Sequence, residues 1–164
     1  MIETHPFGNF VPKNAKYLLL GSFCGRSEPG YDWFYSNKRN QFWKIIENVY
    51  GVEFSDKKSK EKLFTKLGIA VADIIYRCER KKSNNLDTNL VNITYNTQSL
   101  KKLLKNPKIR KIFFSSRFVE AKFEKLFKNV PQELITLPSP SPRYARLTLE
   151  EKVEKYSKEL PKLS

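Results

Sequence analysis

The chain has 164 residues, 40% of them hydrophobic and 13% aromatic, which is enough for the core of one ordinary domain. Its 31 Lys and Arg residues outnumber 17 Asp and Glu residues, and the formal net charge of +14 predicts a polyanionic partner such as nucleic acid. Only two cysteines and one histidine are present, so a zinc or four-cysteine iron–sulfur site is not expected, and we predict no metal and no cofactor.

No run of residues approaches the roughly 18 apolar residues that a membrane helix needs. The opening, MIETHPFGNF, has neither the basic start nor the apolar core of a signal peptide. We therefore expect an intracellular protein, in the cytoplasm or the nucleoid, that does not contact a membrane. No linker, repeat or low-complexity tract divides the chain, so residues 1–164 are expected to form one domain that acts as a monomer.

Hydrophobic periodicity predicts four short buried strands and five amphipathic helices. The helices have recognisable ends: Gly51 and Gly68 follow two of them, and Thr148 with Glu151 has capping-box spacing before the last. Residues 79–89 are polar and are predicted to form a long surface loop. In chain order, the elements are strand 16–23, helix 40–50, helix 56–67, strand 68–75, helix 97–105, strand 110–116, helix 117–128, strand 133–139 and helix 149–160.

Strands that alternate with helices predict right-handed crossovers and a parallel sheet covered by helices on both faces. The expected fold class is α/β, a three-layer α/β/α sandwich around a central, mainly parallel four-stranded sheet. Ligands of such sheets bind beyond the carboxyl ends of the strands. Neither a P-loop nor a GxGxxG fingerprint follows the first strand. The small, polar and basic residues predicted at this rim are Gly21, Ser22, Gly25, Arg77, Arg80, Ser115, Arg117, Ser139, Ser141 and Arg143.

Four segments occur in an order that is typical of a known family. They are LLLGSFCG, FYSNKRNQFW, CER followed by LD, and LPSPSP. Together they resemble the uracil-DNA glycosylase superfamily, and within it most closely the hypoxanthine-DNA glycosylase branch, over about residues 16–146. The resemblance implies an α/β/α protein that flips a damaged base out of DNA and hydrolyses its N-glycosidic bond in base excision repair.

The resemblance also implies roles for single residues. Asn40 matches the catalytic asparagine of the branch in its R-N-x-F-W motif. Residues 21–25 match the first motif, with Cys24 where proline is usual, and PSPSP matches the second motif, which is usually S-T-S-P. After it, Arg143 and Tyr144 replace small or polar residues, which affects the expected substrate preference more than the fold.

The reaction itself narrows the role of Asn40, because glycosidic cleavage develops positive charge on the sugar and negative charge on the leaving base. No carboxylate lies in the sequence near residues 21–25, so an aspartate general base is not expected there. Asn40 is neutral and cannot replace that base, but it can orient a water or donate its amide hydrogens to the departing base. We favour water positioning. Asparagine is also a common helix N-cap, and only the motif around Asn40 favours catalysis over capping.

The remaining predicted site residues divide into two groups. Phe23 is expected to stack on the flipped base, while backbone N–H groups near it read the base edge and Gly25 permits close approach. The prolines and serines of the second motif are expected to form a stiff loop that binds phosphates. The substrate-binding group is Gly21, Ser22, Phe23, Cys24, Gly25 and Ser115, and the DNA-binding group is Arg39, Ser139, Pro140, Ser141, Pro142, Arg143 and Tyr144.

Several residues are predicted to be structural. Phe42 and Trp43 are assigned to the helix core, and Cys24 and Cys78 to packing. Nothing in the sequence supports a catalytic role for His5. The lysines of residues 101–111 are expected at the opposite end of the sheet, as a solvated face.

Two functions therefore remain open, a DNA glycosylase and a nucleic-acid-binding module that has kept the fold but lost catalysis. Hydrolysis of a small nucleotide also suits the fold, but the sequence lacks an acidic metal-binding cluster for it. Uracil, hypoxanthine and xanthine all remain candidate bases.

Overall fold

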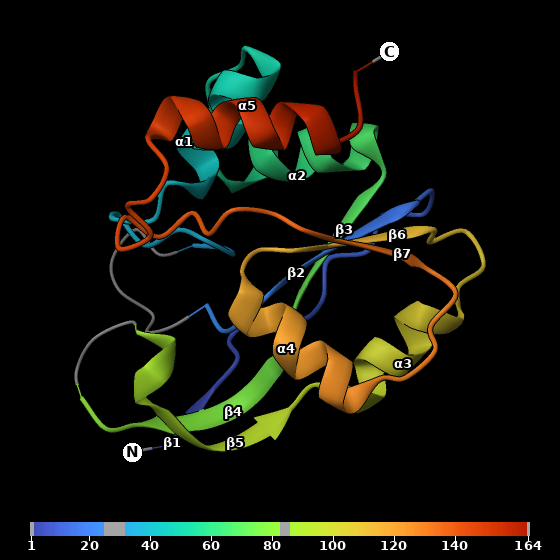
Figure 1. Ribbon diagram of the computed structural model, residues 1–164. Coiled ribbons are helices and arrows are strands. Elements are labelled where there is room, and N and C mark those ends of the chain that lie inside the picture. The colour runs from blue at the N-terminus through green and yellow to red at the C-terminus, as the bar shows by residue number, and fades with distance from the viewer. Residues whose placement is uncertain (1, 25–31, 83–85, 164) are drawn as a thin grey trace.

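The computed structural model describes residues 2–24, 32–82 and 86–163, and its centre is a four-stranded parallel sheet (Figure 1). The strands are β2 (Tyr17–Gly21), β3 (Ile69–Asp73), β6 (Lys111–Phe114) and β7 (Glu133–Thr136). Their order across the sheet is β3-β2-β6-β7, and every neighbouring pair is parallel. These are the four strands that the apolar runs predict, each shorter than predicted because its last residues turn away from the sheet.

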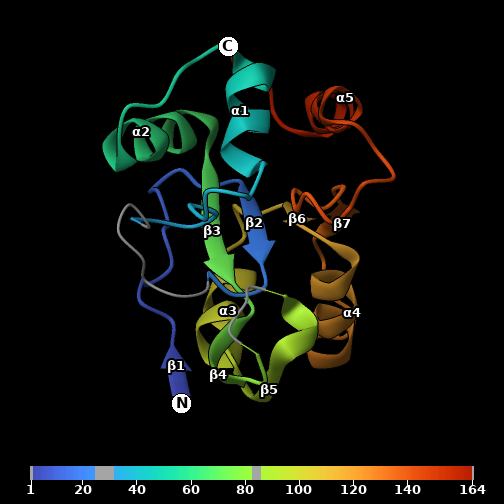
Figure 2. The same cartoon turned by 90° about the vertical axis from the view of Figure 1, so that its left-hand side faces the viewer.

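Helices cover both faces of this sheet, as Figures 1 and 2 show. On one face lie α1 (Phe42–Tyr50), α2 (Lys57–Leu67) and α5 (Leu149–Glu159). On the other lie α3 (Thr97–Lys105) and α4 (Arg117–Leu126). The predicted three-layer α/β/α sandwich is therefore confirmed. None of the described helices has the length and apolar character needed to cross a membrane.

The alternation of side chains along the strands builds two separate cores. Leu18 and Leu20 of β2 are buried with the side chains of α3 and α4. Leu19, between them, is buried on the opposite face with the side chains of α1, α2 and α5. Successive residues of a strand point to opposite faces, so a run that is apolar at every position is the sequence of a strand buried on both sides.

Local capping explains where the helices begin and end. Asp56 accepts a hydrogen bond from Ser59 N at 2.9 Å at the start of α2, and Gly68 ends this helix with φ +73°. Thr148 and Glu151 form the predicted capping box of α5. Helix α1 begins at residue 42, two residues later than predicted, and α4 ends at residue 126, two residues earlier.

A second sheet was not predicted. It is antiparallel, in the order β1-β4-β5, and consists of β1 (Ile2–Thr4), β4 (Ile75–Arg80) and β5 (Leu90–Tyr95). Strand β4 follows β3 after a single residue, and its exposed and polar positions resemble a loop in the sequence. The predicted loop over residues 79–89 is therefore wrong at both ends, because residues 79–80 belong to β4 and Asp87–Asn89 form a short 3-10 helix.

Candidate active site

The carboxyl edge of the parallel sheet brings most of the predicted site residues together. Ser22, Phe23 and Cys24 follow β2, while Ser115 follows β6 and is buried. Ser139 lies three residues after β7. Gly25 lies outside the described residues.

Of the two arginines predicted on this rim, Arg80 reaches it, because its guanidinium carbon lies 5.8 Å from the centroid of the Phe23 ring, whereas Arg77 is an exposed residue of the second sheet. Both lie in β4, within the antiparallel sheet. Arg80 Nε donates to Glu3 Oε2 at 2.6 Å, and its side chain is 6% exposed. The guanidinium therefore links the second sheet, through Glu3, to Phe23 at the end of β2.

Gly21 allows two polar side chains to approach the end of β2. It is paired with Asp73 in the parallel register of β2 and β3. A Cβ atom at Gly21 would lie 2.6 Å from Asp73 Oδ1 and 2.5 Å from the Tyr35 hydroxyl oxygen, both shorter than any real carbon contact. Glycine is thus required here so that a carboxylate and a phenol can lie against the main chain.

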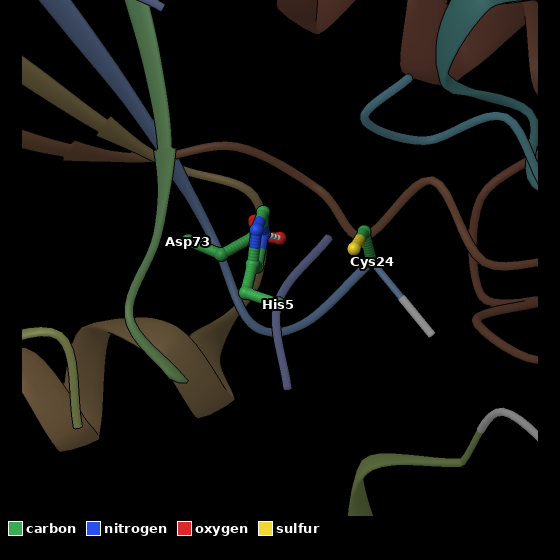
Figure 3. Close-up of side chains that lie close together, drawn as sticks. All are labelled: His5, Cys24 and Asp73. Atoms are coloured by element: carbon green, nitrogen blue, oxygen red, sulfur yellow. Dashed lines mark hydrogen bonds and ion pairs between the residues drawn. The ribbon is translucent and has the colours of Figure 1, made fainter. Parts of the chain in front are cut away.

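Asp73 forms an ion pair with His5, the only histidine of the chain (Figure 3). His5 Nε2 lies 2.7 Å from Asp73 Oδ2, and the two side chains are 6% and 4% exposed. His5 Nδ1 lies 2.6 Å from the carbonyl oxygen of Phe7. Phe7 N also lies 3.2 Å from Nδ1, but the shorter contact to the carbonyl oxygen favours a protonated Nδ1, so both ring nitrogens face an acceptor, as in an imidazolium. Burial lowers the pKa of His5, but the hydrogen bond and charge of Asp73 outweigh it and hold the pKa above 6.5.

The His5–Asp73 pair is expected to stabilise the protein at acidic pH and to lose that contribution in alkali. A histidine whose pKa rises on folding contributes fully below its unfolded pKa of 6.5, and the contribution disappears as the pH rises through the folded pKa. Wild type should therefore exceed His5→Gln in free energy of unfolding by more at about pH 5.5 than at about pH 9. Denaturant unfolding at both pH values measures this, and an equal difference at both would contradict the ion pair.

Asp73 and His5 are the site residues that sequence reasoning missed. Asp73 had a signal, because it is the only charged residue in the apolar run 68–75 and stands at the end of a strand. His5 had none, since it comes from a separate segment, 68 residues away in sequence. The expectation of no carboxylate beside Gly21 considered only neighbours along the chain, and the sheet register supplies one from β3.

The other residues after β2 are held by neighbours from distant segments. Ser22 Oγ donates to Asp87 Oδ1 at 2.8 Å, and burial raises the pKa of that carboxyl group. The ring of Phe23 is half-buried and packs edge-on against His5, with centroids 5.8 Å apart. Burial raises the pKa of the Cys24 thiol, which is 5% exposed. Cys24 and Cys78 are both buried free thiols, as predicted.

Asn40 occupies the turn that leads into α1. Its Oδ1 accepts from Phe42 N at 2.8 Å, so the carbonyl end of the amide faces the helix. Nδ2 makes no hydrogen bond within the described parts of the chain. The next residue, Gln41, donates its backbone N–H to Pro140 O at 2.8 Å, which places Asn40 beside the predicted second motif. The N-cap of α1 is Gln41, so Asn40 is not the cap; its oxygen instead closes a turn with Phe42 N, and its amide hydrogens stay available.

Aromatic stacking connects Asn40 to the end of β2. The ring of Phe42 stacks on Tyr35 with centroids 4.2 Å apart, and the Tyr35 hydroxyl lies against Gly21. Trp43 donates its indole N–H to Phe34 O at 2.7 Å inside the core. Phe42 and Trp43 are therefore core residues, as predicted. Burial, followed by the charge of Asp73, raises the pKa of Tyr35 well above 10, so its hydroxyl is neutral.

The second motif, residues 138–142, forms a loop whose serines are partly engaged. Ser139 Oγ accepts from Ser141 N at 3.2 Å, and Ser141 Oγ accepts from Arg143 N at 3.3 Å. Pro140 is buried. Exposed on or near this loop are Arg39, Pro142 and Arg143. A cleft of about 680 Å³ runs beside it, and its lining includes Arg117, Ser139, Tyr144, Lys155 and Lys158.

Helix α5 holds this loop at two points. Tyr156 donates its hydroxyl to Pro138 O at 2.7 Å. Lys152 Nζ donates to Ser141 O at 3.0 Å and to Gln41 Oε1 at 2.8 Å, and it lies over the ring of Tyr144. The Lys152 side chain is 1% exposed, and burial lowers its pKa. The ammonium group of Lys152 thus holds three segments together: the second-motif loop, the start of α1, and α5 itself.

Removing this ammonium is expected to destabilise the fold. Lys152→Met keeps the aliphatic stem but leaves Ser141 O and Gln41 Oε1 without their donor, at a cost of about 1–3 kcal/mol in the free energy of unfolding. Lys155→Met, at an exposed position of the same helix, is the matched control and should change it by less than about 0.5 kcal/mol. Chemical denaturation measures the free energy of unfolding of both variants. Equal stability of the two would show that the hydrogen bonds of Lys152 do not stabilise the fold.

Comparison with known proteins supports the fold. No family model matches the chain, and no curated protein matches it. Its structure is similar to the solution NMR structure of a "putative Uracil DNA glycosylase" from Methanosarcina acetivorans, with a TM-score of 0.73 and 24% sequence identity. The similarity covers 96% of this chain and 98% of that chain. Both molecules therefore share one α/β architecture over almost their full lengths.

Proposed function

We propose that this protein is a DNA glycosylase of the uracil-DNA glycosylase superfamily that removes a deaminated base from DNA by hydrolysis. The observation that carries the proposal is the position of Asn40, fixed beside the second-motif loop and joined to the end of β2 through stacked Phe42 and Tyr35. The similar Methanosarcina structure, described as a glycosylase of this kind, supports it. The proposal includes a single-domain, monomeric, intracellular protein.

Asn40 would act on the leaving base, on the water, or on both. Its oxygen gives one lone pair to the Phe42 N–H and keeps a second, which can accept a hydrogen bond from the attacking water. Its Nδ2 hydrogens can donate to the base as negative charge develops there. Because the bond to Phe42 fixes the amide plane, both interactions would be preorganised and would cost little reorganisation during the reaction.

Asp73 would read the edge of the flipped base. Its Oδ1 lies at the space that Gly21 leaves open, while Oδ2 is paired with His5. A carboxylate only accepts hydrogen bonds. It therefore favours a ring N–H, such as N1–H of hypoxanthine or N3–H of uracil, over the bare ring nitrogens of adenine and cytosine. Deamination of adenine or cytosine creates this ring N–H, which guanine and thymine already carry, so the contact separates a deaminated base only from its parent base.

The second-motif loop would hold the DNA strand while the base is extruded. Its prolines restrict the backbone, and α5 fixes it through Lys152 and Tyr156. Unstacking a base costs a few kcal/mol, and contacts to the flanking phosphates from Arg143 and the loop would offset part of that cost. Phe23, held edge-on by His5, offers an aromatic face to the base.

The proposal predicts that purified protein, in buffer with a metal chelator, leaves abasic sites in oligonucleotides that carry one deoxyinosine or one deoxyuridine. Alkali then cuts the strand at that position, and gel electrophoresis counts the cut fraction. A panel of single- and double-stranded substrates with uracil, hypoxanthine or xanthine identifies the base. The undamaged oligonucleotide is the control. If stoichiometric protein binds DNA but releases no base, the glycosylase proposal is wrong and the inactive binding module is favoured.

A further inference from the structure

We propose that His5, Cys24 and Asp73 together form a binding site for a divalent metal ion of the zinc type. The side chains come from three separate segments: the residues after β1, the residues after β2, and the end of β3. One ligand atom from each, a ring nitrogen, the sulfur and a carboxylate oxygen, lies within 4.8 Å of the other two (Figure 3). The count of cysteines and histidines had excluded zinc because it did not include a carboxylate.

The three donors suit this ion in kind and in charge. Zinc binds imidazole nitrogen, thiolate sulfur and carboxylate oxygen, and its open sites use three protein ligands with a water as the fourth. A thiolate and a carboxylate carry two negative charges, which balance a dication, so the filled site is neutral. Neutrality matters because Cys24 and Asp73 are 5% and 4% exposed, and an unbalanced charge would be costly there.

The ring of His5 is already held by a hydrogen bond of the kind that orients metal-binding histidines. Its Nδ1–H faces the carbonyl oxygen of Phe7 at 2.6 Å, which orients the ring and directs Nε2 at Asp73. Metal-binding histidines commonly donate their second ring N–H to a backbone carbonyl in this way. On binding, the protons of Nε2 and of the Cys24 sulfur leave, and the cation takes their place.

The site needs only a small adjustment to close around the ion. Zinc–sulfur and zinc–nitrogen bonds of about 2.3 and 2.0 Å place tetrahedral ligand atoms roughly 3.5 Å apart. Because His5 Nε2 and Asp73 Oδ2 are 2.7 Å apart, the ion would separate this pair by about 0.6 Å, while the Cys24 sulfur moves inward by about 1 Å.

Occupancy would inhibit the enzyme, and this consequence rests on the proposed function. The ion would bind Asp73 through Oδ2 and neutralise the carboxylate, and Oδ1, which lies beside Gly21, would then be a weaker acceptor for the flipped base. It would also hold Cys24 against His5, whose ring packs on Phe23. Zinc would therefore act as a reversible inhibitor of base release and a chelator would restore activity.

The test uses cobalt as a spectroscopic substitute for zinc. Titrating Co²⁺ into chelator-treated protein should produce sulfur-to-cobalt charge-transfer absorption that saturates at one equivalent, and Zn²⁺ should abolish it. Cys24→Ala should lose the band, whereas the matched Cys78→Ala should keep it, because Cys78 is equally buried but lies outside the cluster. Asp73→Asn should keep the band and weaken the affinity at least tenfold. Circular dichroism verifies that each variant is folded.

Absence of the band in the wild type, or its loss in Cys78→Ala with retention in Cys24→Ala, would overturn the site. The absorption needs no catalysis, so the two proposals can fail separately. Cobalt binding through Cys24 without release of any base supports the metal site and contradicts the glycosylase. Base release without a cobalt band supports the glycosylase and contradicts the metal site.

Discussion

Asn40→Ala is expected to slow single-turnover base release by roughly 100- to 1000-fold, the loss typical when one preorganised donor is removed from a catalytic site. In this structure the amide hydrogens of Asn40 have no partner within the described residues, while its oxygen is bound to Phe42 N. DNA affinity should change little, because the exposed basic side chains near the loop remain. Single-turnover kinetics beside a DNA-binding titration measures both quantities.

Asn40→Asp separates the chemical role from the hydrogen bond to Phe42 N. Aspartate keeps an oxygen for Phe42 N, so its stability should stay close to that of the wild type, whereas alanine loses this hydrogen bond and about 1 kcal/mol. Both variants lack the amide hydrogens, so both should be slow. A folded Asn40→Ala protein that cleaves at nearly the wild-type rate would eliminate the catalytic assignment, whatever the melting temperatures show.

DNA affinity is expected to fall steeply with salt. If four basic side chains each neutralise one phosphate, the slope of log affinity against log salt is about −3.6, and a fourfold rise in salt weakens binding roughly 150-fold. A fluorescence titration at several salt concentrations gives the slope. A nearly flat plot would refute binding through phosphates. The exposed candidates near the loop and the cleft are Arg39, Arg117, Arg143, Arg146 and Lys155.

Double variants that each remove two positive charges are expected to show which face of the protein binds DNA. Arg117→Gln with Arg143→Gln, at the carboxyl edge, should reduce the magnitude of the slope by about two. Lys105→Gln with Lys108→Gln removes the same charge from exposed positions before the amino end of β6, and it should leave the slope almost unchanged. Equal effects of the two pairs would indicate that the charge acts through the whole protein and not through this face.

The parallel sheet and its helices could be predicted because the hydrophobic residues of each element follow a simple periodic pattern in the sequence. Runs such as YLLLG, apolar at every position, belong to strands buried on both faces, and the helices carry caps such as Asp56 and Thr148. The antiparallel sheet carries no comparable pattern. In β4, the buried Ile75 and Cys78 alternate with exposed and charged residues, so its strand character comes from pairing with β1 and β5.

The site was predictable only where its residues are close in sequence. The motif around Asn40 and the loop of residues 138–142 are short continuous segments, and the bond from Gln41 N to Pro140 O joins them as neighbours. His5 and Lys152 act through partners 68 and 111 residues away. Such contacts depend on how the layers pack against one another, so they cannot be predicted from a local sequence pattern.

The hydrogen bonds of Lys152 affect the order in which parts of the protein can fold during synthesis. Chains are synthesised from the amino terminus, and the four strands of the parallel sheet are complete by residue 136. The second-motif loop follows them, yet the side chains that hold it, at positions 152 and 156, emerge from the ribosome later than the loop itself. A nascent chain can therefore assemble its scaffold before its loop is fixed, and the proposed binding of DNA through this loop can begin only once α5 has docked.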